Sequence, residues 1–185
     1  MDLALVTGAD KEVGERISQK LIEQGFRVYG FAQSFREGGF AHREFYPVVC
    51  DLTSPEMIQK NFEAIVERGE RVFAVVHAEQ RKTRNAFETT ETDEMVYALQ
   101  CGLIGPMVLT RLALPHLLKY HGYVINVAWN GQRRAPWGAV SAATQGGLFH
   151  FGRELFAELR DTGVKVCTVS AEENRWDETG DDNDE

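Results

Sequence analysis

The sequence predicts a three-layer α/β protein in which helices cover both faces of a mainly parallel, six-stranded sheet. Three observations predict this doubly wound fold class. Short apolar runs alternate with stretches of helical periodicity, the first run leads into a glycine-containing turn, and 43% of the 185 residues are hydrophobic. A chain of this size and composition builds one substantial core, so we expect a single domain over residues 1–170.

The elements follow in order from local patterns. Residues 2–7 form an apolar first strand, and the helix expected over 13–24 ends at Gly25. Ser54 predicts the N-cap of a further helix, with Pro55 in its first turn. Further strands are expected at 26–32, 47–50, 72–77, 123–128 and 164–169, and two long helices at 92–119 and 138–160. The first long helix should bend or break near Pro106.

The net charge of -8 is concentrated at the C-terminus, where residues 171–185 hold eight acidic residues and one basic residue. Such a segment buries too little apolar area to offset its chain entropy, which predicts a disordered acidic tail. The acidity argues against nucleic-acid binding, because phosphate contacts need clustered Lys and Arg. No apolar run approaches the length of a membrane span, and no signal peptide is recognised. We therefore expect a cytoplasmic protein without a membrane segment.

The three cysteines show no metal-binding pattern. Cys50, Cys101 and Cys167 are far apart in the sequence, lie in apolar surroundings and lack the spacing of a metal site or a disulfide framework. We expect three buried, reduced thiols and no bound metal.

The first strand leads into the turn Thr7-Gly8-Ala9-Asp10-Lys11-Glu12-Val13-Gly14. Asp51-Leu52 follows the third strand, and Gly122-Tyr123-Val124-Ile125-Asn126-Val127 covers the fifth. In this order and spacing the motifs resemble the short-chain dehydrogenase/reductase family over residues 3–170. The resemblance implies a Rossmann-type fold with a nicotinamide cofactor at the carboxyl ends of the strands. Because family members continue beyond the last strand, it also implies a degenerate, C-terminally truncated member.

The resemblance implies a cofactor site formed by Thr7, Gly8, Lys11, Gly14, Asp51, Leu52, His77 and Ala78. In such a site the backbone amides of the glycine turn and the first helix hold the pyrophosphate. Glu12 replaces the middle glycine of the family turn, and Glu79 lies where the family has Asn-Asn-Ala-Gly. Both carboxylates weaken the binding of an anionic cofactor, unless Glu12 turns into solvent.

Lys11 indicates which cofactor the site would prefer. In family members that use NADP, a basic residue at this position pairs with the 2′-phosphate. Ala32 and Gln33 stand where members that use NAD carry an aspartate. The resemblance therefore implies NADP(H) rather than NAD(H), with a solvated surface lysine as the competing interpretation. His77 could likewise serve as an acid or base, or be a hydrogen-bonded core residue.

The residues that the resemblance implies for catalysis are all replaced. Gly102 stands at the asparagine of the family, Trp129 or Ala128 at the serine, Ser141 at the tyrosine and Gln145 at the lysine. A serine hydroxyl without a neighbouring cation is a poor proton donor near neutral pH, and glutamine supplies no charge. The sequence therefore predicts no catalytic residues and no hydride transfer by the family mechanism.

Three functions remain open. The first is a non-catalytic NADP(H)-sensing or scaffolding subunit. The second is an NADPH-dependent oxidoreductase of the carbonyl reductase type, using substitute groups such as His77 or Ser141. The third is a protein-interaction module without a cofactor, to which the loop over 129–137 would bring two tryptophans and two arginines. Family members commonly pair through the two long helices, so we expect a homodimer or a heterodimer with an active relative.

Overall fold

The computed structural model describes residues 2–79, 86–128 and 138–169. Its strands are β1 (Asp2–Thr7), β2 (Arg27–Ala32), β3 (Phe45–Val49), β4 (Arg71–His77), β5 (Tyr123–Val127) and β6 (Lys165–Val169). Its helices are α1 (Glu12–Glu23), α2 (Pro55–Val66), α3 (Thr92–Leu99), α4 (Gly105–Tyr120) and α5 (Gly138–Leu159), with a 3-10 turn η1 (Phe87–Thr89) and a π-helical segment η2 (Gln100–Ile104). These bounds agree closely with the predicted elements.

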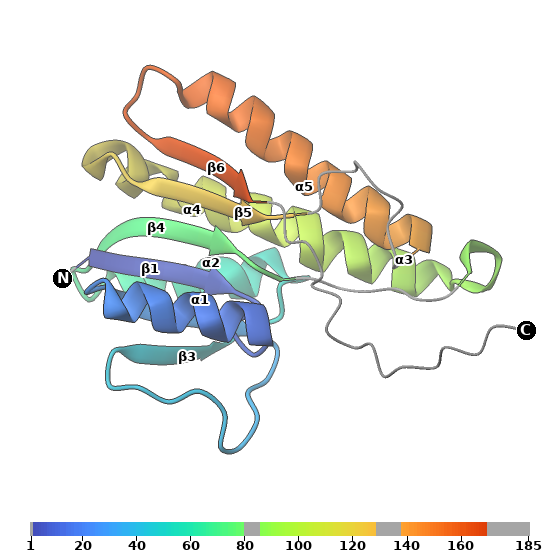
Figure 1. Cartoon of the computed structure of the whole chain (residues 1–185), viewed down its shortest axis with the longest axis horizontal. Coiled ribbons are helices and arrows are strands. Elements are labelled where there is room, and N and C mark those ends of the chain that lie inside the picture. Colours follow the sequence, from blue (N-terminus) through green and yellow to red (C-terminus); the bar gives the residue numbers. More distant parts are fainter. Residues whose placement is uncertain (1, 80–85, 129–137, 170–185) are drawn as a thin grey trace, which may run out of the picture.

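All six strands run parallel in one sheet, in the order β3-β2-β1-β4-β5-β6 (Figure 1). The predicted doubly wound fold class is confirmed. The strand order reverses between β1 and β4, and in open α/β sheets this switch point is where ligands bind. The segments that follow β1, β2, β3 and β4 therefore hold the candidate site.

Two apolar cores attach the helices to the sheet. On one face, Ile17 and Leu21 of α1 pack against a buried cluster that includes Val6 and Val28. On the other face, α2, α4 and α5 contribute to a larger cluster around Leu5. Strand β1 is buried on both faces, which explains why its sequence is a continuous apolar run rather than an alternating one.

The first predicted long helix is interrupted, as Pro106 led us to expect. A π-helical segment, Gln100–Ile104, separates α3 from α4, and Pro106 lies in the first turn of α4. Proline lacks an N–H group, which the first turn of a helix does not need. The wider π turn places Cys101 and Gly102 among the buried residues beside the carboxyl ends of the strands.

Local signals decide where several elements begin and end. The Ser54 hydroxyl accepts a hydrogen bond from the Met57 amide at 3.2 Å, which confirms the predicted N-cap of α2. Gly25, at φ +88°, follows α1 in the left-handed conformation expected of a helix-ending glycine. The predicted third strand was placed too late, because the strand already begins at Phe45.

One cysteine prediction is wrong. Cys50 and Cys101 are buried, but Cys167 is exposed on β6. This strand forms the edge of the sheet, and its alternate residues Lys165, Cys167 and Val169 are all exposed. The apolar sequence around Cys167 therefore indicated a strand but not complete burial.

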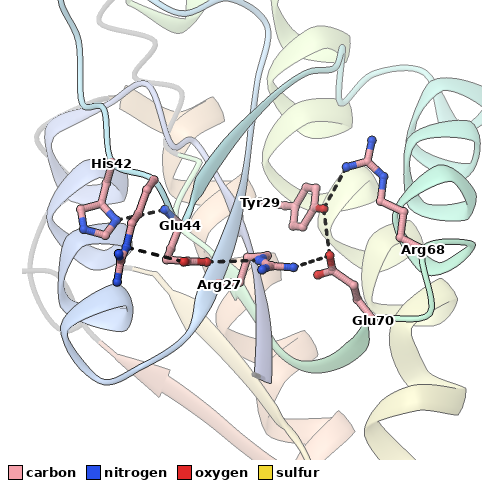
Figure 2. Close-up of polar contacts among 7 residues, drawn as sticks. Arg27, Tyr29, His42, Glu44, Arg68 and Glu70 are labelled. Atoms are coloured by element: carbon pink, nitrogen blue, oxygen red, sulfur yellow. Dashed lines mark hydrogen bonds and ion pairs between the residues drawn. The ribbon is translucent and has the colours of Figure 1, made fainter.

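A charged cluster lies at the amino ends of β2, β3 and β4, opposite the carboxyl ends that hold the candidate site, and Figure 2 shows its residues. Arg27 donates to Glu70 at 2.6 Å and to Glu44 at 3.3 Å, and these hydrogen bonds, chiefly the one to Glu70, raise the pKa of its guanidinium. The Tyr29 hydroxyl donates to Glu70 and accepts from Arg68. The cluster joins β2 to the residues that precede β3 and β4, so it stabilises the sheet rather than forming a ligand site.

One helical stretch, Thr92–Tyr120, is long and apolar enough to cross a membrane by length and composition, with a mean hydropathy of 1.4. This is weak evidence for a membrane span, because core helices of soluble proteins pass the same test. Leu109, Ala113 and Leu117 from this stretch are buried in the larger core of the sheet. Packing against the sheet thus explains part of its apolar character, since 44% of the apolar window is buried.

Candidate functional site

The turn after β1 is built around two glycines. Gly8 has φ +66°, and a Cβ on it would lie 2.7 Å from the Glu79 Cα. A Cβ on Gly14 would overlap the carbonyl oxygen of Gly8. The Lys11 amide donates to that same carbonyl at 3.1 Å and closes the turn. The backbone therefore makes a tight curve at the start of α1 that only glycine permits at both positions.

Thr7 and Ala78 lie beneath this turn. The Thr7 hydroxyl accepts hydrogen bonds from the amides of Ala78 at 3.2 Å and Glu79 at 3.4 Å. Both Thr7 and Ala78 are buried. These two predicted site residues thus fix the end of β4 against the end of β1, next to the glycine turn.

Glu12, which replaces the middle glycine, points into solvent. Its side chain is 77% exposed and pairs with Arg16 one helical turn later, at 2.7 Å. Its φ is not positive, so the position carries no backbone strain. Of the two interpretations of Glu12, the structure supports the one in which the turn tolerates the side chain.

Glu79 behaves in the opposite way. Its side chain is only 6% exposed, and its backbone lies against Gly8 of the glycine turn. The Lys11 ammonium is 3.9 Å from a Glu79 carboxylate oxygen and 3.3 Å from Asp10. Lys11 therefore bridges two carboxylates at the mouth of the turn, and it is not simply a solvated surface lysine.

A cavity of about 180 Å³ opens beside this ion pair. The residues after four strands and from α3 and η2 line it: Asp10, Lys11, Gln33, Ser34, Cys50, Asp51, Leu52, Glu79, Tyr97 and Cys101. The Tyr97 hydroxyl donates to Gln33 at 3.1 Å, and one Asp51 oxygen accepts from the amide and hydroxyl of Thr53 at 2.9 and 2.8 Å. The structure thus brings the predicted residues Lys11, Asp51 and Leu52 together around one pocket.

His77 does not reach this pocket. It is completely buried, and its Nε2 lies 2.7 Å from the Thr110 hydroxyl. Burial lowers the pKa of His77 to about 3, so the ring is neutral at physiological pH. Asn126 pairs with His77 in register on β5, and within the described part of the chain its amide has no hydrogen-bond partner. His77 and Asn126 are thus neighbouring buried polar residues on adjacent strands inside the fold.

The positions implied for catalysis lie in a packed environment. Ser141 is 0% exposed and Gln145 is 2% exposed, both on α5. Ala128 is buried at the end of β5, whereas Trp129 and the loop over 129–137 lie outside the described residues. A Cβ on Gly102 would lie 2.6 Å from the Thr144 methyl, so Thr144 fills the space beside that glycine.

Thr144 is the residue that sequence reasoning missed. It is 2% exposed, and its hydroxyl donates to the Val140 carbonyl of its own helix at 2.9 Å, which leaves its methyl directed at Gly102. The available signal was its place between Ser141 and Gln145 on one helical face. Among the residues with described structure, no group of three His, Cys, Asp or Glu is arranged to hold a metal ion.

Residues 2–173 match the model of the family described as short chain dehydrogenase. The chain belongs to this family. It is similar to a 3-oxoacyl-[acyl-carrier-protein] reductase of Bos taurus, with 26% identity over 186 aligned residues that cover 97% of this chain and 78% of the relative.

Solved structures of family members share the fold. A metagenomic short-chain oxidoreductase in complex with NADP has a TM-score of 0.83 and 24% identity, covering 94% of this chain and 82% of that one. A short chain dehydrogenase from Leptospira borgpetersenii with bound NAD+ has a TM-score of 0.83 and 17% identity, covering 91% and 70%. At these identities the likeness shows the fold alone.

A dinucleotide of the kind bound in those two structures fits one part of this site and not another. The glycine turn approaches β4 closely, and the pocket around Asp51 and Leu52 is open. The Glu79 backbone, however, packs against Gly8, and its carboxylate lies 3.9 Å from the ammonium of Lys11, the N-cap residue of the helix whose N-terminus would hold a pyrophosphate. The nucleoside end of the site therefore fits such a ligand, and the pyrophosphate passage does not.

Proposed function

We propose that this chain is a non-catalytic member of the short-chain dehydrogenase family and acts as a scaffolding subunit. The burial of Ser141 and Gln145 carries this proposal. A group that exchanges a proton with a substrate must come within hydrogen-bond reach of it. Side chains at these two positions are enclosed by the fold and do not meet that requirement.

The Gly102 position supports the same proposal. The resemblance implies an asparagine here that completes a proton relay. In this chain the Thr144 methyl occupies the adjacent space, so the missing side chain has been replaced by apolar packing. A site that had merely lost one residue would keep room for it, and this position keeps none.

A subunit that senses NADP(H) is the more specific version of the proposal, and it requires the Lys11 side chain to change its contacts. The preference for NADP(H) depended on a Lys11 ammonium available for a 2′-phosphate. Because Lys11 contacts Asp10 and Glu79, a dinucleotide must first displace this ion pair. Scaffolding needs no such step, and the third alternative, an interaction module without a dinucleotide, agrees with it. The reductase alternative is the least favoured, since both His77 and Ser141 are fully buried.

We propose that the subunit pairs through its long helices, as a homodimer or with an active relative. Exposed apolar side chains occur on these helical segments, including Ile104 in η2, Met107 in α4 and Phe156 in α5. Exposed apolar residues on helices favour helix–helix association. The proposal places this subunit in the cytoplasm, without a membrane or nucleic-acid partner.

A steady-state assay tests the absence of catalysis. NADPH absorbance is followed with purified protein and a panel of aldehydes, ketones and 3-oxoacyl thioesters. The expected result is no consumption above the rate without protein. Turnover that scales with protein concentration and is abolished in Ser141→Ala would overturn the proposal and restore the reductase alternative.

A further inference from the structure

We infer that the pocket beside the glycine turn binds an uncharged nucleoside, and that the Lys11–Glu79 ion pair excludes ligands carrying a diphosphate. This inference deepens the proposed function, because a subunit that transfers no hydride has no need of the nicotinamide half. It rests on Glu79, which lies where the resemblance implies the small residues of Asn-Asn-Ala-Gly.

The ion pair closes one end of the pocket. Lys11 is the N-cap residue of α1, and Glu79 follows β4, so their contact spans the mouth of the glycine turn. The Glu79 backbone lies so close to Gly8 that no Cβ fits between them. The carboxylate is almost completely buried and so has little freedom to move aside. A diphosphate at the N-terminus of α1 would lie near this carboxylate, because Lys11 is the N-cap of α1 and its ammonium is 3.9 Å from Glu79.

The net negative charge of the pocket lining also disfavours the binding of a diphosphate. Asp10, Asp51 and Glu79 bring three carboxylates to its lining, against the single ammonium of Lys11. The Lys11 charge is already compensated by Asp10 and Glu79. An incoming diphosphate would therefore be repelled, whereas the hydroxyl and amino groups of a nucleoside can donate hydrogen bonds to carboxylates.

The size of the pocket agrees with a small ligand. Sites for drug-sized ligands typically measure about 300–1,000 Å³, and this cavity measures about 180 Å³. Most of the lining is polar, Leu52 is one of its few apolar residues, and Gln33 and Tyr97 hydrogen-bond to each other beside the cavity. A small cavity lined mainly by hydrogen-bonding groups suits a base and its sugar rather than a whole dinucleotide.

Calorimetric titration with adenosine, ADP and NADH tests the inference. Adenosine and ADP differ only in the diphosphate, so their comparison isolates the group that Glu79 is inferred to exclude. The wild-type protein should bind adenosine saturably, and both ADP and NADH should bind at least about tenfold more weakly. In Glu79→Ala the affinity for ADP and NADH should rise about tenfold or more, with adenosine affinity unchanged.

Two further variants serve as controls. One tests whether the charge of Glu79, rather than its size, excludes the diphosphate, and the other tests whether removing any carboxylate near the turn has the same effect. Glu79→Gln keeps the size of the side chain and should also raise ADP affinity, because the excluded group is an anion. Glu12→Ala removes an exposed carboxylate from the same turn and should change neither affinity.

Three outcomes would overturn the inference: wild-type protein binding ADP as tightly as adenosine, no gain in either Glu79 variant, or no adenosine binding at all. These outcomes are independent of turnover. If the protein proved to be an active enzyme, the proposed function would be wrong, but the comparison of adenosine with ADP would still test the inference.

Discussion

The Thr144 methyl lies where a side chain at Gly102 would begin. A Cβ at Gly102 would be 2.6 Å from that methyl, closer than real side-chain contacts allow. The two residues belong to different elements, since Gly102 is in η2 and Thr144 is in α5. Their contact shows that packing between helices closes the space next to Gly102, where the resemblance implies an asparagine.

Gly102→Asn should therefore destabilise the protein. Overpacking at a buried position costs about 1–3 kcal/mol, because neighbouring side chains must leave their preferred rotamers. Urea denaturation measures the loss in the free energy of unfolding. Thr144→Ser removes the obstructing methyl and keeps the hydroxyl, so the double variant should recover part of the loss. Additive effects of the two substitutions would show that the residues do not compete for this space.

The sequence was sufficient for most of the fold, because the information is local. Buried strands such as β1 are continuous apolar runs, and the Ser54 cap is a property of a few neighbouring residues. Strand β3 was placed late, because Phe45 and Tyr46 follow a glycine-containing loop that resembled a longer connection. The extent of the π-helical segment could not be read from Pro106 alone.

The candidate site was less predictable, because its decisive contacts join distant segments. Glu12 and Glu79 both appeared as carboxylates opposed to an anionic ligand. The structure separates them, since Glu12 is exposed and Glu79 is buried beside Lys11. Only the arrangement of β1 and β4 as neighbours brings Glu79 to the glycine turn. The same reason explains why the role of Thr144 was missed.

The buried His77 should make stability depend on pH. Its pKa is about 3 in the folded protein and 6.5 as its ordinary value, so below pH 6.5 the unfolded chain takes up a proton that the folded chain does not. The free energy of unfolding should therefore fall as pH drops from 6.5 towards 3, by at most about 1.4 kcal/mol per pH unit from this residue.

Urea unfolding across this pH window measures the effect as a difference between variants. His77→Asn removes the titrating ring and should flatten the pH dependence relative to wild type. The exposed His150 provides the control, and His150→Gln should leave the slope unchanged. Equal slopes for His77→Asn and wild type would mean that His77 is protonated with equal ease in both states.

The three thiols should differ in their reactivity. Cys167 is exposed, whereas Cys50 and Cys101 are buried in the core, and burial raises the pKa of the Cys50 thiol. Thiolates are the reactive form, so burial and the raised pKa disfavour reaction at Cys50, burial disfavours it at Cys101, and exposure favours it at Cys167. Titration with a disulfide reagent should reveal one fast thiol and two that react only on unfolding. Cys167→Ser should abolish the fast phase, and a fast phase that persisted would contradict this assignment.

An aspartate at Phe156 should disrupt the proposed pairing of subunits. Phe156 is 52% exposed on α5, and a charge there would have to be buried in a helix–helix interface. Light scattering should show a dimer for the wild type and a monomer for Phe156→Asp. Phe87, 63% exposed on η1, gives a matched control in which Phe87→Asp stays dimeric. A monomeric wild type at micromolar concentration would remove the basis of the pairing.

The most direct test of the central claim asks whether this protein can transfer a hydride at all. Protein in excess is mixed with NADPH deuterated at the transferring carbon and with the carbonyl panel, and the products are analysed by mass spectrometry. Including Glu79→Ala separates the loss of catalytic groups from the exclusion of the cofactor. We predict no deuterated alcohol above the protein-free background for either protein. Deuterium transfer by Glu79→Ala or by the wild type, lost in Ser141→Ala, would contradict the account.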